Sequence, residues 1–180
     1  MTGQHFAIFD TAIGACGVLW SERGITGVQL PMGNEEKTRK RIRQRSGEVT
    51  EAAPPADVRR AIERMTELLG GKPNDLAEVV LDLDDVPEFN RGVYDIARRI
   101  PPGKTMTYGE IARQLGGVEL SRDVGQALGR NPCPIVVPCH RVLAAGDKPG
   151  GFSANGGVVT KLKMLEIEGA IVNHTPSLFD

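Results

Sequence analysis

Apolar and polar residues alternate in short blocks over the first thirty positions. The segments HFAIF, GACGVLW and GITGVQL are mainly apolar, and turn-forming residues at 10–13 and 21–24 separate them. This pattern predicts three short strands in an antiparallel meander. Two helices should follow. Residues 35–45 are almost all charged, which favours a solvated surface helix, and residues 56–69 carry apolar side chains at helical spacing.

From residue 85 onward the pattern becomes helical. Apolar residues recur at helical spacing over 87–100, and this stretch ends at the Pro-Pro-Gly sequence at 101–103. Asp85 and Glu88 have the spacing of a capping box, which predicts that Asp85 caps this helix.

Two further short helices follow, joined by a glycine-containing turn in a locally basic stretch. Thr107 and Glu110 form a second capping-box pattern at the start of the first of them, and Ser121 is a candidate cap for the next. Such a pair is a candidate helix-turn-helix, although paired helices are also common in ordinary protein cores.

The complete pattern predicts an α+β protein with two domains. Residues 1–84 should form a small N-terminal α/β module with antiparallel strands, and residues 85–180 a mainly helical C-terminal domain with the helix-turn-helix. A closing helix at 158–169 should point three apolar residues inward: Val158, Leu162 and Leu165.

Composition restricts the class of protein. Of the 180 residues, 40% are hydrophobic and 25% are charged, and the net charge is −1, as in ordinary soluble globular proteins. No apolar run is long enough for a membrane span and the first residues do not resemble a signal peptide, so we expect a cytoplasmic protein without a membrane partner. Cys16, Cys133 and Cys139 are odd in number and unevenly spaced, which indicates reduced thiols rather than a disulfide framework.

Cys139 is the candidate nucleophile, because His140 and Arg141 follow it directly. Cationic or hydrogen-bonding neighbours can lower a thiol pKa from about 8.5 toward neutrality. His140 can serve Cys139 only if the chain turns sharply at this point, and a carboxylate such as Glu168 would orient the imidazole. On spacing alone, a buried inert cysteine beside a structural histidine explains the pattern equally well.

An ordered set of motifs resembles a known family. From Phe89 to Ala170 the chain contains IPPGKTMTYGEIA, SRDVGQALGRNP, IVVPCHRV and MLEIEGA, in the order found in the O6-alkylguanine-DNA alkyltransferases, also called methylated-DNA–protein-cysteine methyltransferases. The first eighty or so residues match only as a version of the family's variable N-terminal domain.

The resemblance implies DNA repair by direct reversal. An alkyl group would move from O6-alkylguanine in duplex DNA, with O4-alkylthymine as a second candidate substrate, irreversibly and stoichiometrically to Cys139. His140 would act as the base, and Glu168 would orient its imidazole, in the family through a water. Asn131 would brace the active-site turn, and Tyr108 would donate a hydrogen bond to the base ring. The family needs no cofactor, and we expect a monomer.

The resemblance also implies how DNA is bound. The helix-turn-helix would approach from the minor groove, with Arg122 entering the base stack in place of a flipped nucleotide. Gly125 and Ala127 are small and would allow a close approach of the helix, and Arg130 is a candidate phosphate contact. Asp123 departs from the small residue common in the family, and its carboxylate should weaken DNA binding.

The substrate pocket is expected to include Tyr108, Val142, Phe152 and Ser153. The backbone carbonyls of Cys139 and Val142 would accept the guanine amino group, and Ser153 would lie near O6. The loop that contains Phe152 is two residues longer than the common form of the family.

Some members of the family carry a structural zinc in the N-terminal domain. His5 and Cys16 lack the further ligands that a tetrahedral site needs, so no metal is expected.

Three other functions remain as alternatives. A thiol hydrolase would use a similar Cys-His pair but needs an oxyanion hole, which nothing in the sequence marks. A thiol alkyl acceptor or redox sensor with a non-DNA substrate would use Cys139 without the helix-turn-helix. A DNA-binding regulator would use the helix-turn-helix without Cys139.

Overall fold

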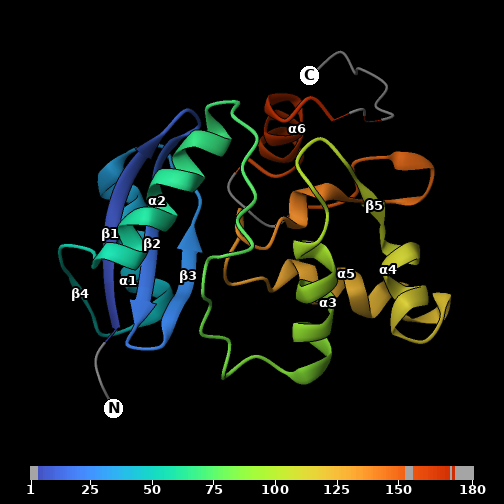
Figure 1. Ribbon diagram of the computed structural model, residues 1–180, viewed down its shortest axis with the longest axis horizontal. Coiled ribbons are helices and arrows are strands. Elements are labelled where there is room, and N and C mark those ends of the chain that lie inside the picture. The colour runs from blue at the N-terminus through green and yellow to red at the C-terminus, as the bar shows by residue number, and fades with distance from the viewer. Residues whose placement is uncertain (1–3, 153–155, 171, 173–180) are drawn as a thin grey trace. The chain divides into compact units, whose positions relative to one another are not determined.

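The structure is a computed structural model that describes residues 4–152, 156–170 and 172. It divides into two compact units, of which the first contains residues 1–85 and 132–136 and the second contains 86–131 and 137–180 (Figure 1). Across the described ranges, every helix is too short or too polar to cross a lipid bilayer.

The first unit is built on the sheet that the alternation predicts. Strands β1 (Gln4–Thr11), β2 (Gly14–Ser21) and β3 (Gly24–Gln29) pair antiparallel in sequence order. A fourth strand, β4 (Val49–Glu51), pairs parallel to β1 and gives the order β3-β2-β1-β4. Three residues are too few to show an alternation pattern, so β4 was not predicted.

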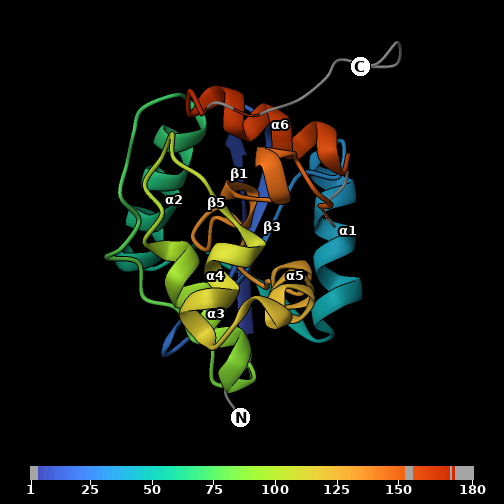
Figure 2. The same cartoon turned by 90° about the vertical axis from the view of Figure 1, so that its right-hand side faces the viewer.

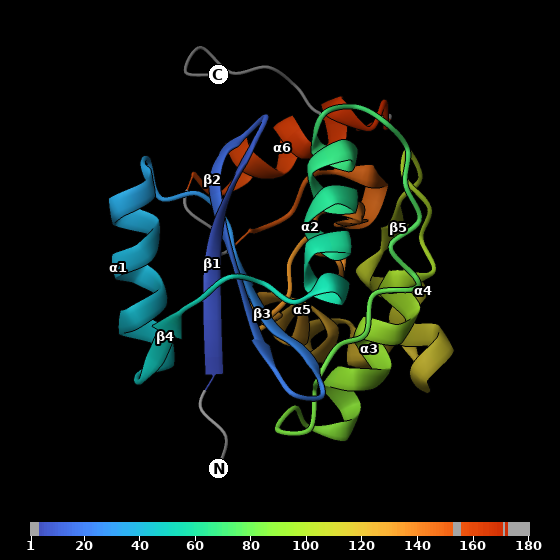
Figure 3. The ribbon, with the colours of Figure 1, turned by 60° about the vertical axis from the view of Figure 1, so that its left-hand side comes forward.

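Two helices cover the two faces of this sheet. Helix α1 (Glu35–Ser46) lies on one side and α2 (Ala56–Leu69) on the other (Figure 3). On the α1 side, Ile42 packs with Phe6 and Leu19. A Cβ atom at Gly17 would lie 2.2 Å from Ile42 Cδ1, so a side chain at this position would force Ile42 to shift.

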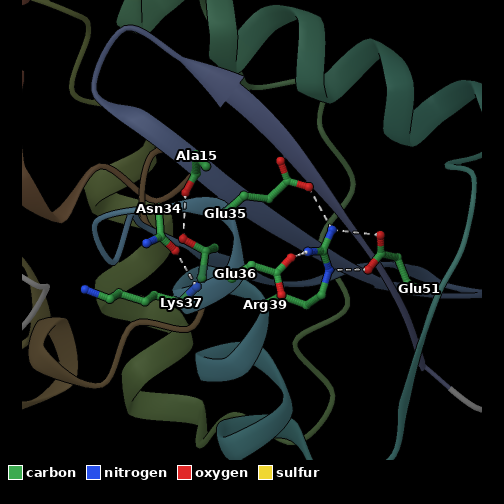
Figure 4. Close-up of polar contacts among 8 residues, drawn as sticks. Ala15, Asn34, Glu35, Glu36, Lys37, Arg39 and Glu51 are labelled. Atoms are coloured by element: carbon green, nitrogen blue, oxygen red, sulfur yellow. Dashed lines mark hydrogen bonds and ion pairs between the residues drawn. The ribbon is translucent and has the colours of Figure 1, made fainter.

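Helix α1 is the charged surface helix that the sequence predicts, and polar contacts attach it to the sheet (Figure 4). Thr38 is buried and donates a hydrogen bond of 2.9 Å to the carbonyl of Ala15. Arg39 pairs with Glu35 of its own helix at 2.8 Å and with Glu51 of β4 at 2.5 Å. Several charged side chains of α1 therefore have partners within the first unit.

The chain returns to the first unit at residues 132–136. The backbone N–H of Val28 donates to the carbonyl of Pro132 at 2.8 Å, and Cys133 is fully buried. Ile135 has a φ of 76°, a conformation that costs a β-branched residue free energy and occurs only where the surrounding structure enforces it. This strained segment directly precedes the Cys139 region.

Three helices form the core of the second unit. They are α3 (Glu88–Arg98), α4 (Tyr108–Leu115) and α5 (Ser121–Gly129), and they pack against one another (Figure 2). The short 3-10 turn η1 (Val118–Leu120) joins α4 to α5. The buried hydroxyl of Tyr94 donates to the carbonyl of Ala127 at 2.6 Å, which ties α3 to α5. The pair α4–α5 is the predicted helix-turn-helix.

One of the three predicted helix caps is confirmed and two are wrong. Thr107 Oγ1 accepts a hydrogen bond of 3.1 Å from the N–H of Glu110, as expected. Helix α3, in contrast, has Pro87 at its N-cap and no side-chain cap, because it begins too late for Asp85 to reach it. Ser121 donates to the carbonyl of Val118 at 2.6 Å instead of capping α5, because a 3-10 turn already leads into that helix.

The remaining elements carry the C-terminal motifs. The 3-10 turn η2 (Cys139–Arg141) leads into β6 (Val142–Leu143), which pairs parallel with β5 (Met106–Thr107). A third 3-10 turn, η3 (Ala145–Asp147), begins the following loop, and α6 (Val158–Ile167) closes the fold.

The predicted inward face of α6 is partly wrong. Val158 is 37% exposed, and the buried side chains of the helix are Lys161, Met164 and Leu165. The buried face therefore includes a lysine, which a search for apolar periodicity assigns to the outside.

Candidate active site

Cys139 lies at the start of a sharp turn. Its backbone N–H donates to the carbonyl of Val137 at 2.8 Å, and the N–H of Arg141 donates to the carbonyl of Pro138 at 2.9 Å. The chain thus folds back within three residues, and this is the sharp turn expected from the sequence, although no hydrogen bond joins His140 to the Cys139 thiol among the described residues. Cys139 is 7% exposed and His140 is fully buried.

A buried polar network lies behind this turn. Glu168, the C-cap residue that follows α6, accepts a hydrogen bond from His140 Nε2 at 2.5 Å. Arg141 donates to both oxygens of the same carboxylate, from Nε at 2.8 Å and from Nη2 at 3.1 Å, and Nη1 donates to the carbonyl of Ile100 at 2.6 Å. The three side chains are 1%, 6% and 3% exposed for His140, Arg141 and Glu168. The contact between His140 and Glu168 is direct, which corrects the expectation of an intervening water.

The network fixes which nitrogen of His140 carries a proton. Burial would raise the pKa of Glu168, but the hydrogen bonds and charges of His140 and Arg141 outweigh it and lower the pKa to about 2. Burial lowers the pKa of His140, so the imidazole is neutral. Because the ionised carboxylate requires a donor, Nε2 carries the hydrogen. Nδ1 is buried without a partner among the described residues, and its lone pair is available to a proton.

The resting thiol is protonated. Burial raises the pKa of Cys139, opposed by a hydrogen bond from Asn131, by the charge of Lys161 and by backbone donors. Asn131 also donates from Nδ2 to the carbonyl of Val137 at 2.9 Å, which places it as the expected brace of the turn. A buried thiol with a raised pKa reacts slowly with incidental electrophiles until a base removes its proton.

Tyr108 and the loop after β6 lie next to one another. Tyr108 opens α4, and a Cβ atom at Gly150 would be 2.8 Å from its hydroxyl, so the loop backbone passes against the phenol. Burial and the neighbouring Cys139 charge raise the pKa of Tyr108, which keeps the hydroxyl a donor. Val142 is fully buried in β6, and Phe152 closes the described part of the loop. Ser153 lies outside the described residues.

Two site residues, Arg141 and Lys161, were not among the predicted ones. The guanidinium of Arg141 holds Glu168 with two hydrogen bonds, and Lys161 is a buried cation whose charge acts on Cys139. A signal for Lys161 exists in the sequence, because residues 161, 164, 165 and 168 follow the i, i+3, i+4, i+7 spacing of one helix face. Glu168, the predicted orienting residue, belongs to that face.

Helix α5 presents part of the predicted DNA-binding set on its surface. Arg122 and Arg130 are exposed, and a Cβ atom at Gly125 would meet no atom within 4 Å. Ala127 is 2% exposed and faces the core, which corrects the expectation that it lies on the approaching face. Asp123 is exposed, and within the described ranges no ion pair joins it to either arginine. Its negative charge therefore remains on the surface of α5.

The other cysteines are packing residues. Cys16 and Cys133 are both fully buried, and burial raises the pKa of Cys16 to about 12. His5 stacks on the Trp20 ring with centroids 6.0 Å apart. No cluster of three or more His, Cys, Asp or Glu side chains that could hold a metal ion is found in the part of the chain that the structure describes.

Comparison with known proteins places this site in a family. Residues 88–170 match the profile of the 6-O-methylguanine DNA methyltransferase DNA-binding domain. A methylated-DNA–protein-cysteine methyltransferase of Methanothermobacter thermautotrophicus is 34% identical over 85% of this chain and 78% of its own length. One from Methanosarcina acetivorans is 32% identical over 93% of this chain and 99% of its own.

A solved structure has a similar fold over most of the chain. The crystal structure of Mycobacterium tuberculosis OGT in complex with DNA is similar with a TM-score of 0.75 and 30% sequence identity, covering 92% of each chain. The Cys139 turn, the network behind it and the helix-turn-helix all lie in the second unit, to which most of the matched range belongs. The chain therefore belongs to the methylated-DNA–protein-cysteine methyltransferase family, whose reaction is DNA repair by alkyl transfer to a cysteine.

Proposed function

We propose that Cys139 accepts one alkyl group from O6-alkylguanine in duplex DNA and is not regenerated. The observation that carries the proposal is the buried chain that links the Cys139 turn through His140 to Glu168 and Arg141. A thiol with a base behind it and a phenol donor nearby has the groups that this displacement requires.

We infer the chemistry from the types of residue around Cys139, since Nδ1 of His140 is buried without a partner in the resting state. Nδ1 of His140 takes the thiol proton, and the sulfur attacks the alkyl carbon. The C–O6 bond breaks as the S–C bond forms, and its electron pair passes to the guanine ring. Tyr108 donates a hydrogen bond to that ring, and the proton taken by His140 passes to the guanine anion, which leaves neutral guanine and a neutral imidazole. The thioether product is a poor leaving group, so each molecule reacts once.

The target base must leave the duplex to reach a cysteine that is 7% exposed. Extruding a nucleotide costs a few kcal/mol, and a side chain inserted into the gap offsets part of this cost. Arg122 is exposed at the start of α5, where it can enter the stack from the minor groove. The neighbour that was crystallised with DNA supports DNA as the binding partner. O4-alkylthymine offers the same alkyl–oxygen bond and is the second substrate to test.

The function is tested with a duplex that contains one O6-methylguanine, followed by intact-protein and peptide mass spectrometry. We expect one added CH2 on Cys139 per molecule, with guanine restored in the DNA. Cys139→Ala and an undamaged duplex are the controls. If the wild-type protein gains mass from a small alkyl donor but never from DNA, the thiol chemistry stands and the DNA substrate is refuted. The exposed negative charge of Asp123 should weaken DNA binding, so it is the feature that favours transfer from a small donor alone.

Alkylation of Cys139 should lower the stability of the protein. The sulfur is buried in a tight turn, and an added methyl group overpacks its surroundings at a cost of about 1–3 kcal/mol. Calorimetry should show the methylated form melting about 2–12 °C below the free form. Equal melting temperatures for the two forms would show that the turn accommodates the methyl group.

Gly125 should be required for DNA binding but not for folding. Its Cβ direction is open, so Gly125→Gln adds a side chain on the surface of α5 and gains about 0.5–1 kcal/mol of helix propensity. We expect unchanged or higher thermal stability together with roughly tenfold weaker binding to duplex DNA, measured by fluorescence anisotropy. Gln126→Ala, at the next exposed position, is the matched control. If Gly125→Gln binds duplex DNA as tightly as the wild type does, this face of α5 is not part of the DNA interface.

A further inference from the structure

Lys161 is a buried cation without a carboxylate partner. It is 1% exposed, and the ion pairs found among the described residues do not include it. Nζ donates to the carbonyl of Val142 at 2.7 Å and to the carbonyl of Gly151 at 3.3 Å. The rings of Tyr108 and Phe152 have their centroids 5.8 Å and 6.0 Å from Nζ. A buried ammonium is costly, and neutral carbonyls and ring faces compensate only part of that cost.

The groups that face this ammonium belong to the reaction site. Val142 lies in β6, Gly151 and Phe152 in the loop after it, and Tyr108 at the start of α4. From the η2 turn, Cys139 and His140 both interact with the charge of Lys161.

The other charges nearby balance one another. The carboxylate of Glu168 is neutralised by the guanidinium of Arg141. Among the described groups, the thiolate that forms on Cys139 during transfer is therefore the anion that can pair with Lys161.

We propose that Lys161 is a positioning residue for alkyl transfer, which ties β6 to the substrate loop through the carbonyls of Val142 and Gly151 and stabilises the Cys139 thiolate with its positive charge. This rests on the proposed function, because the loop and the Val142 carbonyl are then the groups that receive the target base. A carbonyl oxygen has two lone pairs, so Val142 can accept from Lys161 and from a base amino group together. Removing the charge should leave the thiol harder to ionise and the loop less firmly held.

The pH dependence of Cys139 reactivity should carry the signature of Lys161. Burial lowers the pKa of Lys161 to about 8. Below that pH the ammonium is present and favours the thiolate, and above it the charge is lost. Because the thiolate population can only rise with pH, the wild-type reactivity should rise at lower pH than that of a variant with a neutral side chain. The wild-type profile should also be broadened where the ammonium titrates, whereas the neutral variant should show a single step.

The test uses iodoacetamide and needs no DNA, so it is independent of the proposed function. Alkylation of Cys139 is followed by peptide mass spectrometry from about pH 6 to 10, across the range in which thiols and lysines titrate. The variants are Lys161→Gln, which keeps a hydrogen-bond donor without the charge, and Lys163→Gln, an exposed control on the same helix. We expect Lys161→Gln to react about tenfold more slowly at pH 7, corresponding to a rise of one unit in the thiol pKa.

Each outcome bears on the inference. Rates and pH profiles of Lys161→Gln equal to those of the wild type would overturn it. If Lys161→Gln does not fold, the wild-type protein still decides, because a Cys139 thiolate absorbance that titrates in one step, uncoupled from a second group, would equally overturn it. Failure of the wild type to take a methyl group from DNA would refute the proposed function and leave these rates unaffected. A hydrogen-bonding role alone would leave the Lys161→Gln pH profile unchanged, because glutamine retains a donor.

Discussion

Replacing Glu168 with glutamine is expected to destabilise the second unit by about 3–5 kcal/mol, because the change leaves a buried guanidinium without its counter-ion. Arg141 is 6% exposed at its side chain and makes two hydrogen bonds to the Glu168 carboxylate. A neutral amide cannot offset that charge, and one of its two polar atoms is a donor facing other donors. Chemical denaturation of the two proteins measures the difference.

The same substitution should slow transfer by at least about a hundredfold, the usual contribution of a positioned general base. Glutamine can accept from Nε2 of His140, but it cannot stabilise the imidazolium that forms when Nδ1 takes the thiol proton. Single-turnover rates on damaged DNA, measured under conditions where the variant is folded, test this expectation. Glu166→Gln, at an exposed position of α6, is the matched control and should change neither quantity.

The pH dependence of stability gives a second check on Glu168. Its pKa is lowered from 4.5 to about 2 in the folded protein, so its stabilisation is complete above pH 4.5 and is lost as the pH falls toward 2. That shift corresponds to roughly 3 kcal/mol. His140 acts in the same direction at higher pH, because its lowered pKa makes folding less favourable once the unfolded chain takes up a proton below about 6.5. A Glu168→Gln variant that retains the wild-type loss of stability between pH 4.5 and 2 would contradict this assignment.

The sequence predicted most elements of the fold because their signals are local. The meander, the two helices of the first unit and the Thr107 cap depend on periodicity and on contacts three or four residues apart. Strand β4 could not be predicted, since its three residues are selected by pairing with β1. Ser121 was wrongly predicted to cap α5. A 3-10 turn lies directly before it and already leads into the helix.

The residues of the site also fall into two groups, those that the sequence reveals and those whose role depends on the fold. Cys139, His140 and Glu168 are recognisable from their motifs, and the structure brings His140 and Glu168 together as expected. The roles of Arg141 and Lys161 depend on burial, because an exposed guanidinium or ammonium at those positions would have no effect on the thiol. Burial of a charged residue contradicts the usual preference and is visible only when the surrounding elements are placed. The prediction for Ala127 failed because the residue is 2% exposed on the inner side of α5, where its backbone carbonyl accepts a hydrogen bond from Tyr94 of α3.

Replacing Arg122 with alanine is expected to slow transfer from duplex DNA by about a hundredfold and to leave the protein's stability within about 0.5 kcal/mol of the wild type. Arg122 is exposed, so its removal exposes no core and breaks no buried contact. The transfer rate falls because the extruded state of the target base is less stable when no side chain fills the gap that the base leaves in the stack. Single-turnover rates on a duplex with one O6-methylguanine measure it.

Two comparisons separate base flipping from ordinary charge attraction. Arg130→Ala removes an exposed arginine at the other end of α5, and its effect should be smaller and should diminish as the salt concentration rises. The Arg122→Ala defect should instead shrink when the damaged base lies in a mismatch or a single strand, because less unstacking is then required. Reaction with the free O6-methylguanine base should be the same for both variants and the wild type. A defect of Arg122→Ala that is equal on duplex, mismatched and single-stranded DNA would assign Arg122 to phosphate binding and exclude it as the residue that replaces the flipped base.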